Sequence, residues 1–221
     1  MKNYKIIFLL LLTMVGQYVS AQTEVKKPKE VFELYFRTLV NNDEAALNKL
    51  NDYLRPTVEG QDAYQINFKE SSQEMINSSV ENFLSAFSKA AASACKKEAE
   101  DYFMAMIGNF KKAKVTVNNV KIIPNEYLEG EKNAEISYTV SFQLPSKLTH
   151  GPEGDTKKVK AEELKKYLIQ VVEDFKNADK TVTTDQNFSL YELKEGGKIY
   201  YWNGSPDQIV TNLTEFYFDS F

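Results

Sequence analysis

The strictest alternation of apolar and polar residues in the chain lies between residues 134 and 144. Six apolar side chains occupy every second position and polar side chains fill the positions between them. The apolar set is Ala134, Ile136, Tyr138, Val140, Phe142 and Leu144. A period of two predicts a β-strand with one buried face and one solvated face.

Two other regions have the same period. Val115 and Val117 share one phase, whereas Val120 and Ile122 have the other, so the Asn118–Asn119 pair between them predicts a β-bulge that curves the sheet. Further along, residues 188–193 and 199–202 are separated by a Lys-Glu-Gly-Gly-Lys segment, which predicts a β-hairpin.

Apolar residues at three- and four-residue spacing predict helices elsewhere. One covers residues 28–40, and a second ends at Pro56 and has the capping-box pair Asn41 and Glu44 at its start. Residues 71–112 predict one long helix or two helices with a break near Lys96. Amphipathic helices are also predicted over 160–176 and after Ser205–Pro206, and Tyr64, Ile66 and Phe68 alternate as in a short strand or an extended loop.

This order of elements predicts an α+β fold, because helices and strands are segregated rather than alternating. We expect N-terminal helices packed on a curved antiparallel sheet of four to five strands, with an inserted amphipathic helix and a C-terminal helix. Residues 22–221 are expected to form a single domain.

Residues 1–21 have the pattern of a secretory signal peptide. Lys2 and Lys5 precede an apolar run over 6–14, and Val-Ser-Ala at 19–21 places small residues before an expected cleavage between Ala21 and Gln22. The apolar run is about half the length that a membrane-spanning helix requires. No cysteine lies near the junction to accept a lipid, so we expect a soluble bacterial protein that is periplasmic or secreted.

Composition narrows the possible chemistry. The net charge is −4, and removal of residues 1–21 with their two lysines makes it −6, which disfavours nucleic acid and anionic membranes as partners. Cys95 is the only cysteine and His150 the only histidine, so the sequence predicts no intramolecular disulfide and no zinc site. Calcium-loop, phosphate-loop and serine-triad motifs are lacking, and no metal or cofactor is expected.

The segments Val31-Phe32-Glu33-Leu34-Tyr35-Phe36 and Asn42-Asp43-Glu44-Ala45-Ala46-Leu47 resemble the first two helices of nuclear-transport-factor-two-like domains. The curved antiparallel strands agree with this resemblance, whereas the helix over 160–176 would be an insertion. The resemblance implies a cone in which helices cover the concave face of a bent sheet, with a pocket between them. In enzymes of that superfamily, an acidic base and Tyr or His donors line the pocket, but no residue can be carried over by motif.

Three kinds of function follow as hypotheses. The first is a non-enzymatic domain that binds a small ligand or a partner protein, with Tyr138, Tyr200, Tyr201 and Trp202 as candidate ligand-binding residues. The alternative is an isomerase or dehydratase in which a buried carboxylate, Asp43, Asp52 or Asp62, acts beside Tyr35, Tyr138 or Tyr201. A third hypothesis is a structural or assembly factor that binds its partner through an exposed apolar patch on the helix over 160–176. The catalytic residues, if any, are not assigned.

Overall fold

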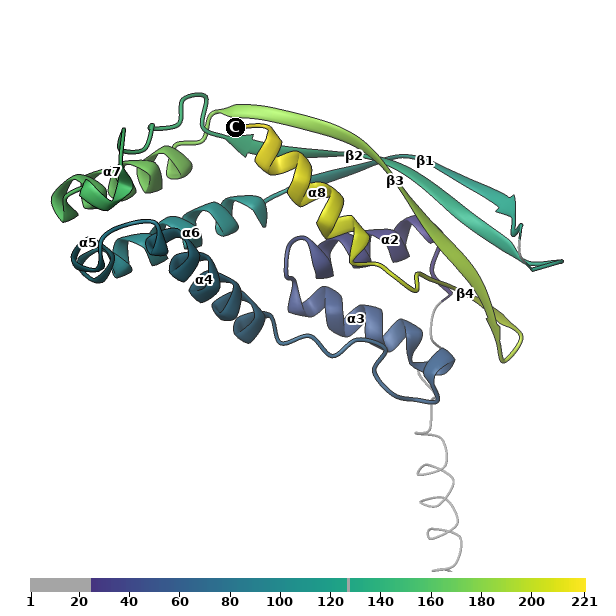
Figure 1. The fold of residues 1–221 in the computed structure, drawn as a ribbon. Helices are drawn as coiled ribbons and strands as arrows, with labels where there is room; N and C mark the ends of the chain where they lie inside the picture. The colour runs from purple at the N-terminus through teal and green to yellow at the C-terminus, as the bar shows by residue number, and fades with distance from the viewer. Residues whose placement is uncertain (1–24, 127) are drawn as a thin grey trace, which may run out of the picture.

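The four strands form one antiparallel sheet in the order β1-β2-β3-β4 (Figure 1). Their bounds are β1 (Lys114–Pro124), β2 (Lys132–Leu144), β3 (Lys180–Glu195) and β4 (Lys198–Trp202). The computed structural model describes residues 25–126 and 128–221. Within these ranges it contains seven α-helices and this sheet, which confirms the predicted α+β class. The expected signal peptide lies outside the described residues.

The predicted bulge is confirmed. The pairing of β1 with β2 shifts register between Val117 and Asn119, which leaves Asn118 as the extra residue. The Asn118 side chain donates a 2.8 Å hydrogen bond to the hydroxyl of Thr139 on β2. A bulge increases local twist, and the strands are curved in Figure 1.

Three helices cover one face of the sheet: α2 (Pro28–Leu39), α3 (Glu44–Leu54) and α8 (Gln208–Asp219) (Figure 1). The Phe32 ring on α2 lies 4.6 Å from the Tyr138 ring and 5.5 Å from the Phe188 ring, measured between centroids. All three side chains are buried. Aromatic side chains therefore fill the space between α2 and the sheet, where the family resemblance implies a pocket.

A second group of helices lies at one end of the sheet: α4 (Phe68–Ser85), α5 (Lys89–Ala94), α6 (Lys96–Phe110) and α7 (Ala161–Lys176) (Figure 1). These helices bury an apolar cluster of their own, and Tyr102 and Phe103 pack against both this cluster and the main core. The predicted break near Lys96 is confirmed, and a further break follows Ser85. Cys95 lies at the junction of α5 and α6, fully buried, and its thiol donates to the Ala161 carbonyl.

Three local predictions were wrong. The α3 helix is capped by Asp43, which accepts from the Ala46 N–H, whereas the Asn41 side chain donates to the carbonyls of Lys111 and Ala113. Residues 64–67 lie in a loop, which was one of the two predicted alternatives, but Phe68 was wrongly included because Asn67 caps α4 and Phe68 begins that helix. Strand β3 begins at Lys180, well before residue 188, and pairs with β2 along residues 133–144.

Strand β4 lies at an edge of the sheet, and tyrosine hydroxyls bond its backbone. The Tyr53 hydroxyl accepts from the Tyr201 N–H at 2.7 Å, and the Tyr35 hydroxyl accepts from the Asn203 N–H at 3.1 Å. The Tyr64 hydroxyl donates to the Asn203 carbonyl at 3.1 Å and lies 2.9 Å from the Tyr35 hydroxyl. We call Tyr35, Tyr53 and Tyr64 the tyrosine edge cover. They connect β4 to α2, α3 and the loop after the 3₁₀ helix η1 (Arg55–Val58).

We expect Tyr53→Phe to lower the free energy of unfolding by about 1–3 kcal/mol, because it leaves the Tyr201 N–H without an acceptor. Tyr191→Phe is the matched control, since the Tyr191 side chain is exposed and its hydroxyl makes no hydrogen bond among the described residues. Urea denaturation measures both values. Equal stability of Tyr53→Phe and Tyr191→Phe would show that the bond to Tyr201 contributes nothing.

Candidate functional site

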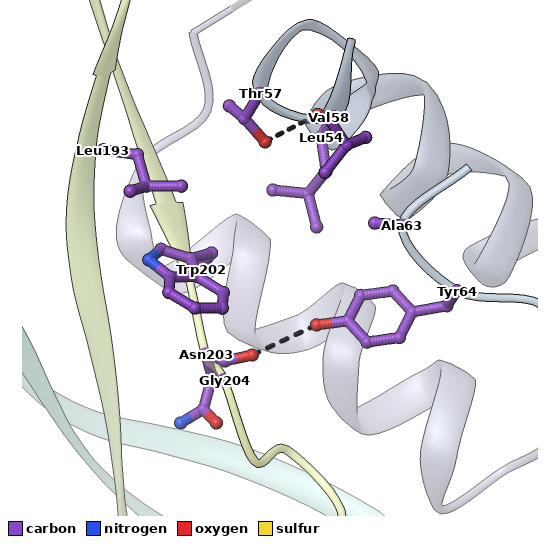
Figure 2. Close-up of a pocket in the computed structure, with 9 residues that line it drawn as sticks. All are labelled: Leu54, Thr57, Val58, Ala63, Tyr64, Leu193, Trp202, Asn203 and Gly204. Carbon is purple, nitrogen blue, oxygen red and sulfur yellow. Dashed lines mark hydrogen bonds between the residues drawn. The ribbon is translucent and has the colours of Figure 1, made fainter. Parts of the chain in front are cut away.

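An open cleft of about 460 Å³ lies between the end of β4 and the C-terminal end of α3 (Figure 2). Its strand side consists of Leu193, Trp202, Asn203 and Gly204, and its helix side consists of Leu54, Thr57, Val58, Ala63 and Tyr64. We call this the Trp202 cleft. Its volume falls in the range of about 300–1,000 Å³ that is typical of small-molecule sites. None of its lining side chains is charged.

Trp202 is placed by its strand and by the glycine that follows. It pairs with Tyr191 across the β3–β4 ladder, and it is partly exposed. A Cβ atom at Gly204 would lie 3.2 Å from Cη2 and 3.3 Å from Cζ3 of the Trp202 ring. Gly204 therefore permits the backbone to pass close to the indole ring, and a larger residue would press on it.

Tyr64 is held on the opposite side of the cleft by Asn51 of α3. The Asn51 amide donates to the Tyr64 carbonyl at 2.8 Å and accepts from the Tyr64 N–H at 2.9 Å. Asn51 is 4% exposed, so these two bonds satisfy a buried amide and fix the loop. The Tyr64 hydroxyl then reaches across to the Asn203 carbonyl, as Figure 2 shows. The two sides of the cleft are thus directly bonded.

Three charged side chains near the rim form one ion-pair cluster with a net charge of −1. The Arg55 guanidinium donates to Asp52 and to Asp62, each at 2.7 Å, and so ties the loop to the end of α3. All three side chains are more than 40% exposed, so each pair contributes little to stability. Each of the three charged groups therefore has an ionic partner, and the cluster as a whole carries a single negative charge.

The structure separates the four candidate ligand-binding residues. Trp202 lines the cleft. Tyr138 is 2% exposed beneath Phe32, and burial raises its pKa well above the ordinary value. Tyr200 is also 2% exposed, with its ring 5.4 Å from that of Tyr53. The Tyr201 hydroxyl donates to a Glu192 carboxylate oxygen at 3.3 Å, and neither residue lines the cleft.

The structure does not place the three candidate carboxylates beside the tyrosines proposed for them. Asp52 and Asp62 pair with Arg55, and Asp43 pairs with Arg37 while capping α3. Tyr35 bonds to Tyr64 and Asn203 instead. Among the described residues, the carboxylate that forms a hydrogen bond with a candidate tyrosine is Glu192, which is 8% exposed and which sequence reasoning did not select.

Within the described residues, no group of three or more His, Cys, Asp and Glu side chains is arranged to hold a metal ion. In the same part of the chain, no helix is both long and apolar enough to cross a membrane. Comparisons of the chain with protein-family models, curated proteins and solved structures gave no match.

Most of the cleft residues were missed from the sequence. Tyr64 and Asn203 are 139 residues apart in the sequence and come together only through the tertiary fold, where they are joined by a direct hydrogen bond and through Tyr35. Asn203 and Gly204 directly follow the aromatic run 200–202, which was the one available signal for the strand side. Nothing in the sequence around Thr57 or Ala63 distinguishes these residues from an ordinary loop.

The pairing of Asp43 gives a test at acidic pH. Hydrogen bonds from Arg37 and from the Ala46 N–H hold the pKa of Asp43 below its ordinary value of 3.8. The resulting stabilisation is present above pH 3.8 and is lost as the pH falls through the lower pKa of the folded protein. We expect Asp43→Asn, which retains a capping oxygen, to lose about 0.5–1 kcal/mol at pH 7 and to show a shallower decline below pH 4.

Thermal denaturation between pH 2 and 7 measures this effect. Asp207→Asn serves as the control, because Asp207 is exposed and its side chain makes no capping bond or ion pair among the described residues. If Asp43→Asn and the wild-type protein lose stability in parallel below pH 4, the pairing of Asp43 is not the cause.

Proposed function

We propose that this protein is an exported, soluble binding domain and that it takes a small uncharged ligand in the Trp202 cleft. The observation that carries the proposal is the neutral lining of the cleft, with the Trp202 and Tyr64 rings on opposite sides (Figure 2). A concave site with apolar and aromatic walls and few polar groups is typical of small-molecule binding.

The polar groups of the cleft are mostly engaged already. The Asn203 side chain donates to the Ser189 carbonyl and accepts from the Ser205 N–H, and Thr57 donates to the Leu54 carbonyl. An incoming ligand therefore gains little from new hydrogen bonds and most from contact with rings. This favours a compact apolar or aromatic ring compound over a ligand rich in hydroxyl groups.

Binding is favoured over the isomerase or dehydratase alternative by the positions of the carboxylates. That chemistry requires an acid and a tyrosine facing a shared pocket, whereas Asp43, Asp52 and Asp62 are engaged with arginines. Glu192 does lie beside Tyr201, but neither residue lines the Trp202 cleft. A small ligand is favoured over a partner protein because the site is a cleft between two segments rather than a flat apolar surface.

Trp202 is the only tryptophan in the chain, so its fluorescence reports directly on the cleft. We expect indole-free aromatic ring compounds to quench or shift its emission in a saturable way, with neutral sugars binding at least about tenfold more weakly. Calorimetry should show that Trp202→Ala loses this binding. Saturable binding that survives Trp202→Ala would place the site elsewhere, and preferential binding of sugars would overturn the proposed ligand class.

Two glycine variants provide a matched pair. In Gly204→Ala the new methyl presses on the Trp202 ring, and we expect about tenfold weaker binding of the same ring compound. In Gly108→Ala, on α6, the new methyl meets nothing within 4 Å, and we expect unchanged binding with equal or greater stability. Equal affinities of the two variants would contradict the role given to Gly204.

Export has a separate test. Expressed in a bacterial host with a periplasm, the full chain should accumulate outside the cytoplasm with Gln22 as its first residue. Mass spectrometry of the intact protein measures this, and Lys2→Glu with Lys5→Glu should reduce export because it removes the positive n-region. A cytoplasmic protein of full length would overturn this part of the proposal.

A further inference from the structure

A second recess, apart from the Trp202 cleft, lies between α8 and α6. It has a volume of about 140 Å³, and Met106, Phe110 and Tyr217 are among its lining residues. Met106 and Tyr217 are buried and therefore lie deep in the recess, whereas Met75 and Phe218 line it with about half of their surface exposed. We call it the α8 groove. It shares no lining residue with the Trp202 cleft.

The lining of the α8 groove is apolar except for Lys111, Asn42 and Thr214. Lys111, at the C-terminal end of α6, is therefore its only charged side chain. The Lys111 ammonium donates a 2.9 Å hydrogen bond to the Ser72 hydroxyl. Among the described residues, no carboxylate lies within 4.0 Å of it, in contrast to the lysines at 97 and 165.

The Lys111 ammonium is thus a cation with spare hydrogen-bonding capacity at the side of an apolar groove. An ammonium group has three donors, and one is used by Ser72. Burial lowers the pKa of Lys111, which shows that its charge is partly desolvated without a compensating anion. An anion bound here would restore a favourable environment for the charged form.

We propose that the α8 groove binds an amphiphile with a single alkyl chain and an anionic head, of the medium-chain fatty acid type, whose carboxylate pairs with Lys111. The alkyl chain lies against Met106, Phe110 and Phe218. A partner helix, about 10–12 Å across with its side chains, would need more space than this recess of about 140 Å³, whereas a single alkyl chain can lie along it with part of its surface exposed. Methionine side chains at 75 and 106 adapt readily to a flexible chain.

Calorimetric titration of the wild-type protein with three ten-carbon probes, each below its micelle concentration, tests the head-group preference. We expect decanoate to bind at least about tenfold more tightly than decanol, because a hydrogen bond between charged groups is stronger than one between neutral groups. Decyltrimethylammonium should bind more weakly than decanol. Failure of decanoate to bind, or equal affinity for decanoate and decanol, would overturn the proposal.

Three variants locate the site. Lys111→Met should reduce decanoate affinity to that of decanol, whereas Lys112→Met, which removes the same charge at the exposed neighbouring residue, should leave the preference intact. Thr214→Trp fills the groove and should weaken decanoate and decanol alike. An equal loss of decanoate affinity in Lys111→Met and Lys112→Met would indicate unspecific attraction to positive charge. Unchanged decanoate binding in Thr214→Trp would place the alkyl chain elsewhere. Either result overturns the proposal.

These measurements are independent of the proposed function. None of the three variants changes a residue of the Trp202 cleft, so ring compounds should still bind to all of them. Trp202 fluorescence measures this in Lys111→Met and Lys112→Met, and calorimetry measures it in Thr214→Trp, which carries a second tryptophan. A protein that binds decanoate but no ring compound would support the groove and contradict the cleft, and the reverse result would do the opposite.

Discussion

The position of the β3–β4 hairpin depends on the three hydroxyl groups of the tyrosine edge cover. An edge strand exposes backbone N–H and C=O groups that need partners. Tyrosine hydroxyls meet both needs because each can donate and accept. The N–H groups of Tyr201 and Asn203 and the Asn203 carbonyl are all bonded in this way. The same bonds set the distance between hairpin and helices, and hence the width of the Trp202 cleft.

The other edge of the sheet is protected differently. Strand β1 carries exposed lysines at 114 and 121 and a bulge at Asn118, features that discourage pairing with a further strand. The difference between the two edges follows from their surroundings. Strand β4 lies beside α3, whose Tyr53 is within reach, whereas β1 depends on its own charged side chains and irregular register.

Elements governed by local pattern were predictable, and contacts between distant segments were not. The alternation over 134–144 correctly predicted β2, and the Asn118–Asn119 pair correctly predicted the bulge. Both could be predicted because side-chain period and strand register are local properties. Asn41 was misread because its side chain bonds to the carbonyls of Lys111 and Ala113, some 70 residues away. The Trp202 cleft was missed for the same reason, apart from Trp202 itself.

The aromatic content explains why both recesses lie at the margins of the core. Phe32, Tyr138 and Phe188 are in ring contact between α2 and the sheet, so the interior offers no space for a ligand there. The two recesses lie elsewhere, at the end of β4 and beside α8. The two recesses then differ in chemistry through their rims. The charges beside the first are paired around Arg55, whereas the second includes Lys111, which has no carboxylate partner among the described residues, so the two recesses present different charges to a ligand.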